Sequence, residues 1–236
     1  MAHTKREAYE ALLQKALDTR MSDISRRRLL RNAGITGGAA ALGSVGFAAA
    51  QDDATPEEGE LATPDGGASP FDGPVDVLNY ALTLEHLEST FYREGLAEFD
   101  SAAFEELDFQ SSVFDNLSEI AAHEAAHVEA LTATVTELGG EPVSELTYDF
   151  GYEDAAGFLE VAQALEDTGV SAYQGAAQYL IDEDELLTAA LTIHGVEARH
   201  AAYLALLNEA SPFPEAVNPT LTPEEVLEIA TPFIVE

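Results

Sequence analysis

The feature that most constrains the fold is a glutamate at the centre of each of four apolar helical faces. When residues are placed 100° apart around a helix axis, four segments show one apolar face each, at roughly 75–98, 111–138, 155–180 and 183–208. The residues at the centres of these faces are Glu85, Glu124, Glu166 and Glu197. Burying an unpaired carboxylate costs several kcal/mol. A core that takes in all four therefore needs compensating charge.

Two of the segments add a histidine three residues after the central glutamate. His127 follows Glu124 and His200 follows Glu197, which places each imidazole about 60° further around the same face. A lone E-x-x-H motif is a weak signal, but each of these lies in the middle of an apolar helix face. Each also comes one helix after a segment with a single central glutamate.

The chain contains an internal repeat. Tyr92 follows Glu85 by seven residues and Tyr173 follows Glu166 by seven, so each half reads E-x6-Y and then E-x-x-H. Short connections at 100–110 and 181–184 join the helices within each half, whereas a longer connection at 139–154 joins the halves. This pattern predicts an all-α, ferritin-like four-helix bundle with a long crossover between helices two and three. A capping Thr222 followed by Pro223 predicts a short C-terminal helix.

These motifs resemble those of the ferritin-like superfamily of carboxylate-bridged dimetal proteins. In that superfamily two helices give one glutamate each and two helices give one E-x-x-H each. The resemblance covers about residues 74–208 and implies two divalent metal ions, iron or manganese. It implies six ligands: Glu85, Glu124, His127, Glu166, Glu197 and His200. The stretches Leu78–Glu88 and Phe91-Tyr92 look like the branch that includes plant desiccation-related proteins and exported microbial relatives.

Charge and composition agree with a dimetal site. Four carboxylates and two neutral imidazoles balance two divalent cations, and oxygen with imidazole ligands suits iron or manganese. Beyond residue 50 the only basic residues apart from histidine are Arg93 and Arg199, so few protein cations are available to pair with buried glutamates. The absence of cysteine excludes disulfides, thiolate metal sites and thiol nucleophiles.

Several polar residues near the motifs have two interpretations. Glu88 lies three residues after Glu85, where the third helix has Gly169. It is either an extra ligand or a gate, or else a residue at the bundle edge that faces water, and the water-facing position is favoured. Tyr92 and Tyr173 either hydrogen-bond ligand carboxylates or relay electrons, or only pack in the core, and packing is favoured. His123 and His194 are either supporting groups behind the ligands or satisfied residues at the bundle boundary. The polar side of the first segment carries Asn79, His86, Thr90 and Arg93, with His86 expected to face water.

An export signal is predicted before the bundle. A basic stretch at Ser25–Arg31 precedes an uncharged run at Asn32–Gln51 that includes Ala48–Ala50, which resembles a twin-arginine signal. We expect residues 1–50 to be the signal region, residues 51–74 an acidic Pro/Gly linker and residues 75–236 the ferritin-like domain. The translation start is either Met1 or Met21, and an amphipathic N-terminal helix stays an alternative. Five glycines in the uncharged run argue against an uncleaved membrane anchor, so no membrane span is expected in the mature chain.

The chain is strongly acidic, with a formal net charge of −34. Of its 44 acidic residues, 40 lie beyond residue 50 and are spread along the bundle, which argues against nucleic-acid and anionic-membrane partners. The pattern indicates adaptation to concentrated salt, because screening at high ionic strength removes most of the self-repulsion.

Three functions fit these features. The first is an exported or cell-surface protein, carried by the twin-arginine machinery, whose dinuclear centre is redox-active towards Fe(II), oxygen or peroxide. The second is a stress- or desiccation-associated structural protein that uses metal for stability without turnover. The third is iron storage, which needs a closed cage and is disfavoured by the linker and the charge. A homo-oligomer stays open.

Overall fold

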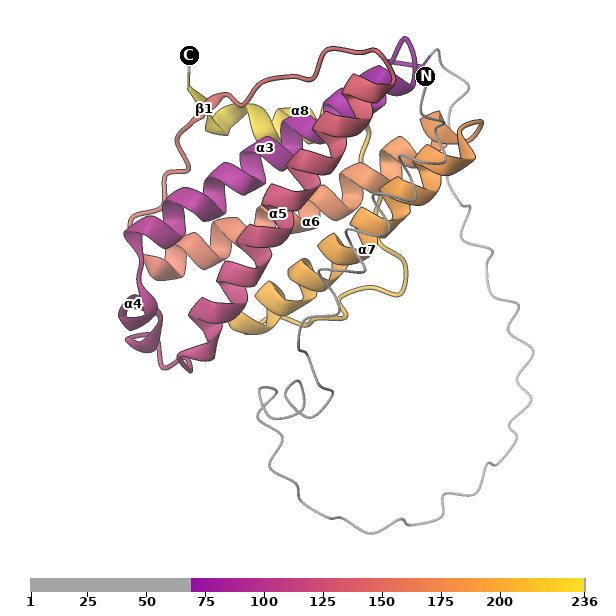
Figure 1. Cartoon of the computed structure of the whole chain (residues 1–236). Coiled ribbons are helices and arrows are strands. Elements are labelled where there is room, and N and C mark those ends of the chain that lie inside the picture. The colour runs from indigo at the N-terminus through magenta and orange to yellow at the C-terminus, as the bar shows by residue number, and fades with distance from the viewer. Residues whose placement is uncertain (1–68, 236) are drawn as a thin grey trace, which may run out of the picture.

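A bundle of four long helices forms the body of the protein. The structure, a computed structural model, describes residues 69–235. The long helices are α3 (Pro74–Glu98), α5 (Ser112–Glu137), α6 (Ala155–Ala176) and α7 (Asp184–Leu207). Helix α3 packs against α5, α6 packs against α7, and α3 also contacts α6, so two hairpins lie together (Figure 1). The predicted all-α class and the ferritin-like bundle are confirmed.

Shorter elements connect and cover the long helices. They are α4 (Ser101–Glu105), β1 (Thr147–Tyr148), the 3-10 turns η1 (Ala177–Leu180) and η2 (Thr231–Phe233), α8 (Pro223–Ala230) and β2 (Ile234–Val235). Strand β1, in the crossover, pairs antiparallel with β2 near the C-terminus. The predicted C-terminal helix is α8, whose Thr222 and Glu225 form a reciprocal capping box.

Two local expectations from the sequence differ from the structure. The predicted loop at 100–110 contains α4, because the Asp100 side chain accepts hydrogen bonds from the amides of Ala102 and Ala103 and Phe104 is buried. The third helix was expected to run to Leu180, but its last turn tightens into η1, as helix ends often do.

The crossover runs along the polar side of α3. Asn79 donates to Glu141 O and accepts from Val143 N, and His86 Nε2 lies 3.2 Å from Val143 O. Further along, Arg93 pairs with Glu145 at 2.8 Å. The expectation that His86 faces water is therefore wrong, since the crossover half-buries it.

An aromatic cluster holds the end of the crossover against the bundle. Phe91 of α3 and Phe158 of α6 stack with ring centroids 4.6 Å apart. Phe150 and Tyr152 from the crossover meet Phe91 edge to face, at 5.0 and 5.7 Å. Tyr152 also meets Phe158 edge to face at 5.6 Å, so its ring contacts both hairpins and helps to fix them relative to each other.

The predicted export signal and most of the predicted linker lie outside residues 69–235. At the described end of that linker, the ring of Phe71 contacts those of Tyr80 and Tyr179, at 5.5 and 5.2 Å. Within residues 69–235, none of the helices combines the length and the apolarity that a membrane crossing requires.

Candidate metal centre

The structure brings all six predicted ligands together in the middle of the bundle. Helix α3 supplies Glu85, α5 supplies Glu124 and His127, α6 supplies Glu166, and α7 supplies Glu197 and His200. The four glutamates are fully buried, and His127 and His200 are 8% and 5% exposed. Each side chain lies on the apolar face of its helix, so packing of the four faces forces the carboxylates to converge.

The six residues form two overlapping groups whose potential ligand atoms lie within 4.8 Å of one another. Glu124 and Glu197 belong to both groups. Glu85 and His127 complete one of them, and the other is completed by Glu166 and His200. Two adjacent cation positions that share two carboxylates therefore fit this arrangement.

The Nδ1 atom of His127 faces three carboxylate oxygens. It lies 3.1 Å from Glu85 Oε2, 3.3 Å from Glu124 Oε2 and 3.0 Å from Glu197 Oε1. A ring nitrogen carries at most one proton, so it can donate to one of these oxygens and leaves the others without a donor.

The Nδ1 atom of His200 repeats the arrangement in the second group. Its distances are 3.0 Å to Glu124 Oε1, 3.2 Å to Glu166 Oε2 and 3.7 Å to Glu197 Oε2. Both imidazoles therefore turn the same nitrogen towards the carboxylates, which is the orientation that a metal ligand needs.

Within residues 69–235, three buried carboxylate oxygens of this cluster form no hydrogen bond: Glu124 Oε1, Glu197 Oε1 and Glu197 Oε2. Each of the first two lies 3.0 Å from an imidazole Nδ1, which faces other carboxylates as well. Leaving a charged group unsatisfied in this way is costly, and a cation removes the cost. Neighbouring ligands around an octahedral cation with bonds of about 2.1 Å lie about 3.0 Å apart, close to the shorter distances seen around His127 and His200. The donor set and its spacing thus fit divalent metal binding.

Comparison with known families agrees with this geometry. The family model described as a ferritin-like domain matches residues 73–210, more than half of the chain. The chain belongs to this family. A comparison with curated proteins gave no match.

Two tyrosines of this ferritin-like bundle hold the outer carboxylates. Tyr92 on α3 donates to Glu166 Oε1 on α6 at 2.6 Å, and Tyr173 on α6 donates to Glu85 Oε1 on α3 at 2.5 Å. Both tyrosines are buried, so they pack in the core and also orient potential ligands. Each tyrosine therefore donates to the glutamate of the other hairpin. This reciprocal pairing supports the repeat predicted from the E-x6-Y spacing.

Burial and mutual repulsion control the protonation of the centre. Burial raises the pKa of Glu85 to about 8 and raises the pKa of Glu166 well above its usual value. Burial alone would lower the pKa of His200, but the surrounding glutamates raise it to about 12. Protons on the imidazoles and outer carboxyls thus balance part of the charge, and a bound cation competes with them.

Glu88 is a buried member of the same centre. The favoured expectation placed it at the bundle edge facing water, which is wrong because Glu88 is 3% exposed. The space that it occupies exists because α6 has Gly169 there. A Cβ atom at that position would lie 3.0 Å from Glu88 Oε1. Burial, followed by repulsion from Glu197 and Glu166, raises the pKa of Glu88 well above its usual value.

His123 and His194 lie outside the carboxylate cluster. His123 Nδ1 lies 3.0 Å from His200 Nε2, so His123 contacts the ring nitrogen that faces away from the glutamates. This is the position of a supporting group that fixes the ring of a ligand histidine. The Nε2 atom of His194 is buried without a hydrogen-bond partner within the described part of the chain.

Proposed function

We propose that this protein is an exported ferritin-like protein that holds two divalent cations, iron or manganese, and uses them in redox chemistry with Fe(II), oxygen or peroxide. The observation that carries the proposal is the set of unsatisfied oxygens on Glu124 and Glu197, enclosed between two imidazoles that both present Nδ1. A centre built only for packing would fill this space with apolar side chains.

Each residue of the centre has a distinct role in the proposal. Glu85 and His127 would hold one cation, Glu166 and His200 the other, and Glu124 and Glu197 would bind both. Once bound, the metal pair would supply the electron transfer. Tyr92 and Tyr173 keep the outer carboxylates, Glu166 and Glu85, turned inward by donating their hydroxyl protons to them. The apolar faces around the centre exclude bulk water.

Export and salt adaptation belong to the proposal on sequence grounds. The twin-arginine route carries folded proteins, so the bundle can take up metal before export. The basic stretch at Ser25–Arg31 and the small residues at Ala48–Ala50 support this route. The 40 acidic residues beyond residue 50 support a working environment of high ionic strength.

Metal analysis joined to two activity assays tests the proposal. Purified protein should retain two metal ions per chain, and a Glu197→Ala, His200→Ala variant should retain less than half as much. The loaded protein should consume oxygen with Fe(II) or decompose peroxide with Mn(II) at high salt. Two bound metals with neither activity would reject the redox role in favour of the structural alternative. Absence of bound metal would reject both.

A further inference from the structure

An apolar cavity of about 50 Å³ lies in the bundle next to the carboxylate centre. All four long helices line it, and on three of them a lining residue lies one helical turn from a potential ligand. Ala81 precedes Glu85 by four residues, Leu131 follows His127 by four, and Ile193 precedes Glu197 by four. The fourth wall contains Tyr173 itself. Because Tyr173 donates to Glu85, the cavity lies next to the centre, although none of the six potential ligands lines it.

The lining offers nothing that would hold a charged or polar ligand. It contains no charged residue, and alanine and leucine are its commonest members. Thr134 Oγ1 already donates to Ala130 O, and Thr192 Oγ1 to Ala189 O.

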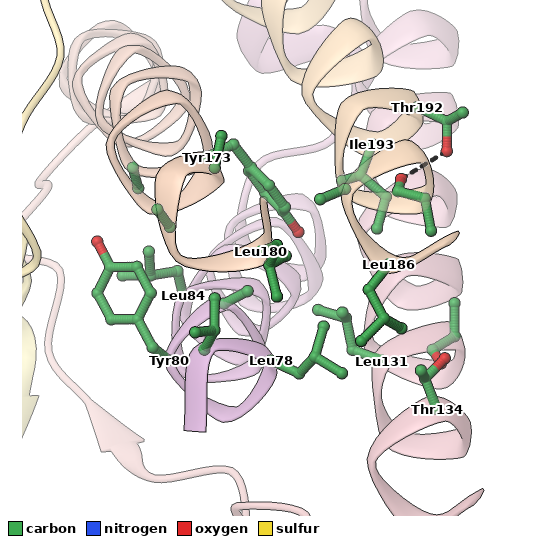
Figure 2. A pocket seen from close by; sticks show the side chains of 18 residues that line it. Leu78, Tyr80, Leu84, Leu131, Thr134, Tyr173, Leu180, Leu186, Thr192 and Ile193 are labelled. Carbon is green, nitrogen blue, oxygen red and sulfur yellow. Dashed lines mark hydrogen bonds between the residues drawn. The ribbon is translucent and has the colours of Figure 1, made fainter. Parts of the chain in front are cut away.

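Figure 2 shows Leu78, Leu131, Leu180 and Leu186 converging from separate elements, with the Tyr80 hydroxyl pointing away from them. Apolar cavities of this kind stay dry, although the space exceeds the roughly 10–15 Å³ that one water molecule needs.

The cavity extends towards the surface between α5 and α7. Thr192 is exposed there, and Ala130 and Ala189 are half-buried. A molecule that enters between these helices would meet only uncharged side chains before Tyr173. The cavity thus lies between this surface and Tyr173, whose hydroxyl donates to Glu85 of the centre.

We propose that this cavity binds dioxygen and admits it to the centre from the Tyr173 side. Dioxygen is neutral, apolar and diatomic, so it fits a small cavity whose one unpaired lining hydroxyl, on Tyr80, points away from the leucines. Hydrogen peroxide both donates and accepts hydrogen bonds and would lose its hydration there without replacement. The cavity therefore favours oxygen over peroxide on this route. Its role in turnover rests on the proposed redox function, whereas its ability to bind gas does not.

Xenon, an apolar probe of comparable size, tests the binding directly. Crystals of the full chain under xenon pressure should show a xenon atom between Leu131, Ala176 and Ile193, with or without bound metal. No xenon at this place would overturn the proposal. Ordered water or an acyl chain in crystals without xenon would overturn it as well.

Filling the cavity tests the route. Ala190→Leu and Ala176→Leu place a larger side chain in the lining from two different helices, so the test survives if one variant fails to fold. The matched control is Ala202→Leu, a half-buried alanine of α7 that does not line the cavity. Thermal unfolding and metal content establish that each variant is folded and loaded.

Either filling variant should lose xenon and consume oxygen with Fe(II) several-fold more slowly, while its reaction with hydrogen peroxide stays at the parent rate. The control should match the parent in all three measurements. Loss of xenon without slower oxygen uptake would overturn the route. A loaded parent that consumes no oxygen would instead refute the redox function, and the xenon result would still decide whether the cavity binds gas.

Discussion

The hairpins α3–α5 and α6–α7 carry the same potential ligands at the same spacing, but their surroundings differ. Three residues after the first glutamate, α3 has Glu88 where α6 has Gly169. Immediately before the E-x-x-H motif, α5 has His123 where α7 has Val196. The repeated spacing thus determines which potential ligands meet. The residues that differ between the hairpins, such as Glu88 and His123, set the charge and the hydrogen bonding around each half of the centre.

The largest expected effects come from removing ligands one at a time. Glu124→Ala or Glu197→Ala should abolish binding of both metals, because each of these carboxylates belongs to both groups. Glu85→Ala or Glu166→Ala should remove about one metal of the two. Metal content per chain after desalting measures this, with the exposed Glu119→Ala on α5 as control. Equal losses in all four variants would contradict the shared roles of Glu124 and Glu197.

The second effect is the pH dependence of the metal-free protein. Glu85, with its pKa raised to about 8, and His200, with its pKa raised to about 12, keep protons that the unfolded chain releases near pH 4.5 and 6.5. The folded state therefore binds more protons between about pH 5 and 8, so its free energy of unfolding should fall as pH rises, by a few kcal/mol. Urea unfolding of metal-free protein at several pH values checks this.

Bound metal should reverse the trend. Cations must displace the protons held by the imidazoles and outer carboxyls, so affinity should rise with pH over the same range. Titration with Mn(II) at pH 5, 6.5 and 8 measures it. Affinity that is independent of pH would show that the centre is not where the metal binds.

A smaller effect should follow from removing the acidic group of Glu88, which the second hairpin lacks at the equivalent position. Glu88→Gln keeps the shape of the side chain and removes a buried acid whose pKa is raised by burial. The metal-free protein should gain about 1–3 kcal/mol at pH 8 and much less at pH 5, because the advantage that the unfolded chain draws from ionising Glu88 grows as pH rises above about 4.5. Denaturant unfolding at both pH values measures the gain. The same change at both would assign it to packing alone.

The smallest effect concerns the ends of α5 and α7, which use the same closing hydrogen bonds. Gly139 follows α5 with φ 78°, and Gly140 N donates to Val135 O. After α7 the equivalent position is Glu209 with φ 57°, and Ala210 N donates to Ala205 O. Because the left-handed conformation penalises a side chain, Glu209→Gly should stabilise by about 0.5–1 kcal/mol. Thermal unfolding measures this, and Gly139→Ala, the matched reverse change, should destabilise.

Helical periodicity predicted the four long helices within a few residues, because their apolar faces are long and regular. It also placed Glu85, Glu124, Glu166 and Glu197 on faces that meet. The position of Glu88 could not be read in this way, since its 60° offset places it equally well in water or beside a small residue. Only the packing of α3 against Gly169 decides between the two.

Contacts between distant parts of the chain escaped prediction for the same reason. The polar side of α3 looked solvent-facing, but the crossover covers His86 and leaves Thr90 2% exposed. The hydrogen bond from His123 to His200 joins residues 77 positions apart. The apolar cavity likewise depends on where four helix faces fail to fill space, which no single face reveals.

Anomalous X-ray diffraction from crystals of the iron- or manganese-loaded protein tests the central claim most directly. Two peaks should appear inside the bundle, one beside Glu85 and His127 and one beside Glu166 and His200, with Glu124 and Glu197 between them. A single peak, or no peak among these residues in protein that retains metal, would contradict the dinuclear centre.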